Sequence, residues 1–302
     1  MQHDHLPAIN PGFARNFAFA IAIGAFSAAL LAPFVAFLLA SAGFRFPFPR
    51  ICDRVAMVTI GAALVLFAER LQLVALLHTG FGRPLSNWPS LLKGLGTGMT
   101  VIVILSGLAL VATHQTPLLA ALTVKAITVL PAAFLIAVLE EAFFRAILLG
   151  GLSRNSHRAP LITSAVIYAA AHLVHGPKHF YVSGFHPLAG FADLTASLTQ
   201  LVFPGDLFAM ACGLFLLGLV LGQAFLGTGR VHFAIGLHAA FVVGAKCWPI
   251  VVGSALIPRW LAGPGPVPLI AAPAGWVAAL LLLGLTRARF FRTFAPAPET
   301  TI

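Results

Sequence analysis

Long runs of apolar residues, separated by short polar or proline-rich breaks, follow one another along almost the whole chain. Many of them reach the roughly 18–20 residues that an α-helix needs to cross a hydrocarbon core of about 30 Å. The pattern predicts eight membrane-spanning helices, at residues 17–42, 55–79, 91–113, 125–150, 159–175, 206–228, 231–251 and 267–286. We therefore expect an all-α fold, a polytopic bundle of membrane helices.

The breaks between the runs suggest three sections along the chain. Residues 1–115 are expected to form about three membrane helices, 116–250 a central core, and 251–302 a last membrane helix with a basic tail. Within the core, the polar-rich connection 176–205 is long enough to form a lid or an interfacial segment. Small residues four positions apart allow helices to approach closely, and such contacts are predicted at the glycine pairs Gly94/Gly98 and Gly218/Gly222.

Composition supports the membrane interpretation and excludes nucleic acid as a partner. Hydrophobic residues make up 60% of the 302 positions, charged residues only 9%, and the mean hydropathy is +0.98. The formal net charge of +10 comes from Lys and Arg at the ends of apolar runs, with no basic helix or aromatic-basic patch. The excess of these cations on one side places both termini in the cytoplasm. The expected surroundings are a lipid bilayer, the inner membrane if the source is bacterial.

Three charges stand inside one apolar run, "AVLEEAFFRAILLG" at 137–150. An intramembrane charge costs at least about 2.5–3.5 kcal/mol on insertion scales, so such residues tend to be paired and functional. Glu141 and Arg145 have the i, i+4 spacing of a favourable helical ion pair. Glu140 lies about 100° further round the helix, without a partner there. A buried structural network and a reactive carboxylate are both compatible with Glu140 alone.

Two histidines on later runs favour the reactive interpretation. His172 follows Tyr168 by four residues on one helical face, and His238 lies eight residues beyond Arg230. At ~1.5 Å per residue, the depths from the cytoplasmic side are ~15 Å for Glu140, ~18–20 Å for His172 and ~12 Å for His238. A lone membrane histidine is usually a packing residue, but three polar groups at matching depth predict one shared site. A carboxylate beside two imidazoles suits hydrolysis by an activated water.

These residues resemble the motifs of the CPBP family, the glutamate-dependent intramembrane proteases that include CAAX prenyl endopeptidases. The family pattern is E-E-x-x-x-R, F-x-x-x-H and H-x-x-x-N on successive membrane helices, and the resemblance covers about 120–245. It implies that Glu140 activates water, and that His172 and His238 orient it and stabilise the oxyanion. Glu141 with Arg145 would hold the first helix. The substrate would be a membrane-embedded or membrane-associated protein or peptide.

The chain departs from this pattern at two positions, with Tyr168 in place of Phe and Val242 in place of Asn. Loss of one oxyanion donor lowers rates by roughly 10²–10³ where it has been measured. Lys246 lies one turn beyond Val242 and His175 one turn beyond His172, so either is a candidate substitute donor. We expect no cofactor. A zinc ion held by one Glu and two His is the alternative, although H-E-x-x-H is absent.

Two further functions were weighed against the intramembrane protease. One is a catalytically inactive scaffold or bacteriocin-immunity-type membrane protein that keeps the fold. The other is a transporter with Glu140 as proton carrier, which the lack of an inverted repeat or a second broken helix disfavours. A metal site at the loop histidines His175, His179 and His186 is disfavoured as well, because such residues are usually solvated.

Overall fold

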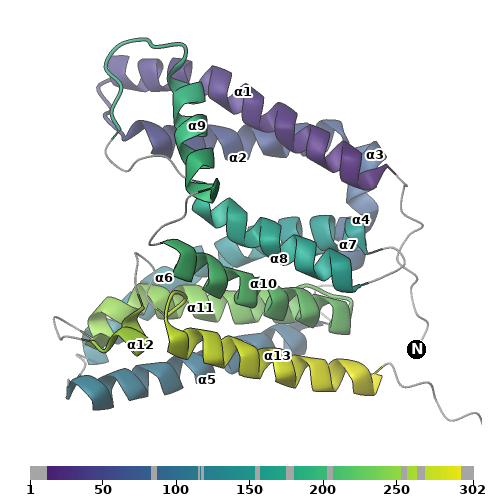
Figure 1. Ribbon diagram of the computed structural model, residues 1–302, viewed down its shortest axis with the longest axis vertical. Coiled ribbons are helices and arrows are strands. Elements are labelled where there is room, and N and C mark those ends of the chain that lie inside the picture. Colours follow the sequence, from purple (N-terminus) through teal and green to yellow (C-terminus); the bar gives the residue numbers. More distant parts are fainter. Residues whose placement is uncertain are drawn as a thin grey trace, which may run out of the picture. The chain divides into compact units, whose positions relative to one another are not determined.

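The computed structural model describes residues 12–82, 87–114, 116, 119–153, 157–174, 180–202, 207–252, 257–263 and 269–293, and every regular element in them is a helix (Figure 1). The longer elements are α1 (Phe13–Ser41), α2 (Phe48–Leu66), α5 (Trp88–Thr113), α6 (Leu119–Glu141), α8 (Arg158–Leu173), α9 (Ala189–Val202), α10 (Phe208–Thr228), α11 (His232–Val252) and α13 (Pro273–Thr293). The shorter ones are α3 (Ala68–Leu71), α4 (Leu73–Phe81), α7 (Gly150–Leu152), α12 (Arg259–Ala262) and the π-helix η2 (Ala142–Leu149). The all-α prediction is confirmed.

Among the residues that the structure describes, five helical stretches are long and apolar enough to cross a membrane. They are α1, α5, the continuous stretch Leu119–Leu152, α10 and α11. The predicted helices at 159–175 and 267–286 correspond to α8, which has 16 residues, and α13, whose apolar part is also short. The chain is therefore an integral membrane protein, whereas the predicted count of eight spanning helices is not confirmed.

The expectation of one continuous helix at 55–79 is wrong. The chain forms α2, α3 and α4 in succession, and Gln72 between the last two has a left-handed backbone with φ of 51°. The polar sequence Glu69, Arg70, Gln72 interrupts the apolar run at this break. The connection at 176–205 also differs from a plain loop, because it contains helix α9.

The chain divides into two compact units, described separately here. The first unit comprises residues 1–76 and 170–205. In it, α1 packs along α2, and α9 crosses α1 where Gly190 meets the backbone of Ala29. A small core of Ala32, Phe48 and Ala189 joins these three helices.

The second unit comprises residues 77–169 and 206–302, and α11 is its central helix. α11 packs against α5 and α6, while α10 packs against α13 (Figure 1). A Cβ atom on Gly94 would meet the carbonyl oxygen of Phe233, and one on Gly98 would lie 2.5 Å from the Cβ of Ala240. Both contacts join α5 to α11, so the predicted close approach at this pair is confirmed.

The second predicted glycine pair lies on α10, which approaches α8 there. A Cβ on Gly218 would be 3.0 Å from the Cα of Ala165, and one on Gly222 would be 2.5 Å from a methyl of Leu161. The absence of side chains at these two positions lets the helices approach, as the spacing predicted. Together these close contacts hold α5, α8, α10 and α11 around the polar residues of the second unit.

Candidate functional site

The segment that carries the two glutamates changes its helical form where the charges begin. α6 ends at Glu141 and continues as the π-helix η2, in which hydrogen bonds span five residues instead of four. The Ser164 hydroxyl on α8 donates a hydrogen bond to the Phe144 carbonyl oxygen at 3.1 Å, which joins α8 to η2. π-helical turns are rare and occur frequently at functional sites.

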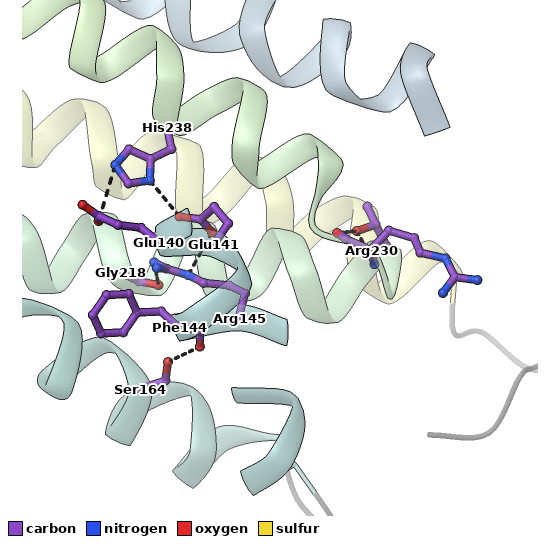
Figure 2. Close-up of polar contacts among 9 residues, drawn as sticks. Glu140, Glu141, Phe144, Arg145, Ser164, Gly218, Arg230 and His238 are labelled. Carbon is purple, nitrogen blue, oxygen red and sulfur yellow. Dashed lines mark hydrogen bonds and ion pairs between the residues drawn. The ribbon is translucent and has the colours of Figure 1, made fainter. Parts of the chain in front are cut away.

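Glu141 lies at the centre of a buried polar cluster (Figure 2). One carboxylate oxygen, Oε1, is 2.8 Å from His238 Nδ1, and the other, Oε2, is 3.2 Å from Arg145 Nε. The Glu141 side chain is fully enclosed and those of Arg145 and His238 nearly so. Burial of an unpaired charge is costly, so the carboxylate is stabilised by being shared between the guanidinium and the imidazole.

Arg145 is enclosed by groups from three helices. Its Nη2 donates to the carbonyl oxygen of Gly218 at 3.4 Å, and its guanidinium carbon lies 4.5 Å from the centre of the Tyr168 ring. A cation over an aromatic face is attracted by the ring's quadrupole. Tyr168 also meets the His238 ring edge to face, with centroids 6.3 Å apart. The tyrosine ring thus covers both the cation and the imidazole.

Glu140 is the most exposed residue of the cluster, although its Oε2 oxygen, which faces His238, is buried. Its side chain is 27% exposed, against 0% for Glu141 next to it. Its Oε2 lies 3.8 Å from His238 Nε2, which is too long for a strong direct hydrogen bond. If Glu141 is ionised and His238 is neutral, Glu141 can only accept, so that Nδ1 carries the imidazole proton and Nε2 presents its lone pair to Glu140. Two acceptors therefore face one another across a short gap.

The structure brings together five of the residues singled out in the sequence, namely Glu140, Glu141, Arg145, Tyr168 and His238. His172 is half-buried one turn beyond Tyr168 on α8, but it belongs to the first unit. Its convergence with Glu140 stays a prediction.

The two proposed compensating positions lie further along α11. Val242 is half-buried and packs beside Ala133, Val243 and Cys247. Lys246 is exposed, and among the described residues no hydrogen bond or ion pair joins it to the polar cluster. His175, the other suggested donor, and His179 lie outside the described residues, and His186 bonds locally to the Ser183 carbonyl oxygen. The replacement of the expected Asn is thus an apolar side chain among apolar neighbours.

Three features of the cluster had not been expected from the sequence. Glu141 was expected to pair with Arg145, and its contact with His238 was missed because the two residues are 97 positions apart. The roles of Ser164 and Gly218 were missed as well. Ser164 lies one turn before Tyr168 on the same helical face, a spacing that could have indicated it.

A metal ion would need a group of suitable ligands. In the part of the chain that the structure describes, no three His, Cys, Asp or Glu side chains are arranged to hold one.

Comparison with known proteins agrees with the position of the cluster. Residues 122–244 match the family model described as type II CAAX prenyl endopeptidase Rce1-like. No curated protein and no solved structure matches the chain. The matched residues include both glutamates, Arg145, Tyr168 and His238. Residues 122–244 of this integral membrane protein therefore form an Rce1-like domain of the CAAX prenyl endopeptidase type.

Proposed function

We propose that the chain is an intramembrane endopeptidase in which Glu140 activates a water molecule. The observation that carries the proposal is the gap of 3.8 Å between Glu140 Oε2 and His238 Nε2. In the proposed arrangement, a water bound at this gap donates a hydrogen bond to each acceptor, so that its own lone pair is directed outwards. The fixed orientation of His238, held through Nδ1 by the buried Glu141, supports this arrangement.

In the proposed reaction, these groups account for each proton that moves and each bond that forms or breaks. Glu140 takes one proton from the water while the resulting hydroxide adds to the carbonyl carbon of the scissile peptide bond. The carbonyl oxygen becomes an oxyanion, for which His172 is the proposed donor. The intermediate then breaks at the C–N bond, and Glu140 returns its proton to the leaving nitrogen. No metal ion takes part in this proposal.

The proposed substrate is a protein or peptide that itself reaches the membrane. Glu140 lies on a stretch long enough to span a bilayer, so the scissile bond must enter from the lipid or from its surface. The family description supports a C-terminal segment that carries a prenylated cysteine as the first substrate to test. We place the protein in a bacterial inner membrane with both termini in the cytoplasm.

The test is cleavage of defined peptides by the purified full-length protein in lipid nanodiscs. Prenylated and unprenylated peptides with a C-terminal CAAX sequence are incubated with it, and the products are identified by mass spectrometry. Glu140→Gln keeps the shape but cannot take a proton, so we expect turnover to fall by roughly 10³-fold. Glu69→Gln changes an exposed glutamate of α3 and serves as the matched control.

Unchanged turnover in Glu140→Gln would exclude this glutamate as the base. The same assay after prolonged treatment with a strong chelator separates the two forms of hydrolysis. We expect an unchanged rate, and loss of activity restored in step with added zinc would show a metal-dependent reaction instead.

A non-enzymatic scaffold or immunity protein is the second candidate, favoured by Val242. The side chain at this position lies beside Ala133, Val243 and Cys247 and offers no donor to an oxyanion. If the wild type is inactive for this reason, Val242→Asn supplies an amide N–H and should reveal cleavage. If the wild type is active, Lys246→Met should slow it, and Val242→Asn should partly restore the rate. A demonstrated substrate whose turnover changes in neither variant would place position 242 outside the site.

A further inference from the structure

A second cavity lies in the same unit as the polar cluster and shares none of its residues. Its volume is about 480 Å³, within the range of pockets that hold small molecules. It lies where α5 and α11 begin and where α10 and α13 end. None of Glu140, Glu141, Arg145, Tyr168 and His238 lines it. The proposed hydrolysis therefore leaves this cavity without a role.

Part of the lining is polar and includes one cation, Lys93, whose side chain is exposed. The first turns of α5 contribute Ser90, Lys93 and Thr97, which recur at helical spacing on one face. Gln223 on α10 donates one amide hydrogen to the Leu283 carbonyl oxygen at 3.4 Å, and its second amide hydrogen is a further donor. The hydroxyl of Thr97 is bonded to the Lys93 carbonyl oxygen at 2.7 Å, which leaves the ammonium group as the main donor.

The charges around the cavity favour an anion. In this unit, the acidic side chains that the structure describes are Glu140 and Glu141, and neither lines the cavity. Asn87, the N-cap residue of α5, makes no side-chain bond that caps the helix. The first turn of a helix has free backbone N–H groups and a partial positive charge, so it adds to the attraction of Lys93.

The apolar part of the lining comes from α11 and α13. Phe233 and Leu237 from α11 and Leu282 from α13 form it, and Leu285 on α13 is 63% exposed. Trp88, at the start of α5, is 57% exposed. Tryptophan is enriched at the membrane–water interface, so this end of α5 lies at headgroup depth. A ligand here has its charged part at the interface and its apolar part towards the hydrocarbon.

We infer that this cavity binds an anionic phospholipid, with its headgroup at Lys93 and its acyl chains against Leu282 and Leu285. A soluble anion would use the same cation but would gain nothing from the leucines and Phe233. A zwitterionic lipid would fill the apolar part of the lining, but the positive charge of its own ammonium group would repel that of Lys93. The preference for an amphiphile with net negative charge distinguishes the proposal from both.

The experiment is native mass spectrometry of the full-length protein in neutral detergent, titrated with short-chain phosphatidylglycerol. Phosphatidylcholine of the same chain length and inorganic phosphate are titrated in parallel. We expect one phosphatidylglycerol to bind more tightly than either. Lys93→Gln should weaken it by roughly fivefold, the effect of one interfacial cation. Lys125→Gln, an exposed lysine of α6 outside the cavity, is the matched control and should have no effect.

A second variant tests the cavity itself. Thr97→Phe places a ring in it and should abolish binding, while the thermal midpoint without lipid shows whether the fold is retained. Equal binding of the two lipids, equal effects of Lys93→Gln and Lys125→Gln, or full binding in a folded Thr97→Phe protein would overturn the proposal. Inorganic phosphate binding as tightly as the lipid would also overturn the proposal, because the apolar part of the lining would then contribute nothing to the affinity.

Discussion

At the scale of single residues, two adjacent glutamates have different surroundings. Glu141 is fully buried and bonds to both Arg145 and His238, whereas Glu140 is 27% exposed beside His238 Nε2. Neighbouring positions on a helix point about 100° apart, so one turn can carry both a structural and an accessible carboxylate. These different surroundings explain why two glutamates are adjacent in the sequence.

The different surroundings of Glu140 and Glu141 predict that Glu→Gln substitutions at the two positions affect stability unequally. Glu141→Gln leaves Arg145 buried without its anion, and removal of one partner of a buried pair costs about 3–5 kcal/mol. We expect a lower yield and a lower midpoint of thermal unfolding in detergent. Glu140→Gln should change neither by much, because that side chain is partly exposed. Equal stability of the two variants would show that the buried ion pair contributes little to the fold.

At the scale of elements, small residues determine which helices meet. The Gly94 position on α5 leaves no room for a Cβ beside the Phe233 carbonyl oxygen, a backbone group that cannot rotate away. Gly222 on α10 faces only the ends of the Leu161 and Leu149 side chains, which can move. Gly94 therefore marks a rigid contact, whereas Gly222 marks an adaptable one.

Alanine substitutions along α5 test whether the contact at Gly94 is rigid. Gly94→Ala should lower the stability of the protein by about 1–3 kcal/mol, the usual effect of overpacking. Gly96→Ala is the matched control, since nothing lies within 4 Å of a Cβ at that position. It should be neutral or slightly stabilising because alanine favours the helix. Thermal unfolding of both purified variants measures the difference, and a tolerated Gly94→Ala would mean that α5 and α11 can separate.

At the scale of the whole molecule, the distribution of Lys and Arg predicts the orientation in the membrane. The side that carries the termini also collects most of the cations at the ends of apolar runs, and cytoplasmic loops have such an excess. Lys93, in the proposed lipid cavity, belongs to this side. Its headgroup would therefore come from the cytoplasmic leaflet.

Reporter fusions measure this orientation in a bacterial host. A fluorescent protein that folds only in the cytoplasm should be bright at either terminus. Alkaline phosphatase, which is active only outside, should be inactive at both. A bright fusion at one terminus and an active phosphatase at the other would mean an odd number of spans, and the predicted eight would then be wrong.

Local patterns in the sequence determined the membrane class, the helical fold and the identity of the charged residues. Hydrophobic length sets the medium, and the i, i+4 spacing of Glu141 and Arg145 sets their pairing, because both depend on neighbours along the chain. The glycine pairs were predictable for the same reason. The domain boundaries and the roles of His172, Val242 and Lys246 stay predictions.

Contacts between distant segments were decided only by the tertiary structure. His238 meets Glu141 across 97 positions, and the Ser164 hydroxyl meets the Phe144 carbonyl oxygen across 20. The left-handed turn at Gln72 and the helix α9 were not predicted from the apolar runs. The site and the cavity at Lys93 each combine several helices, and the packing of those helices against one another sets which side chains meet.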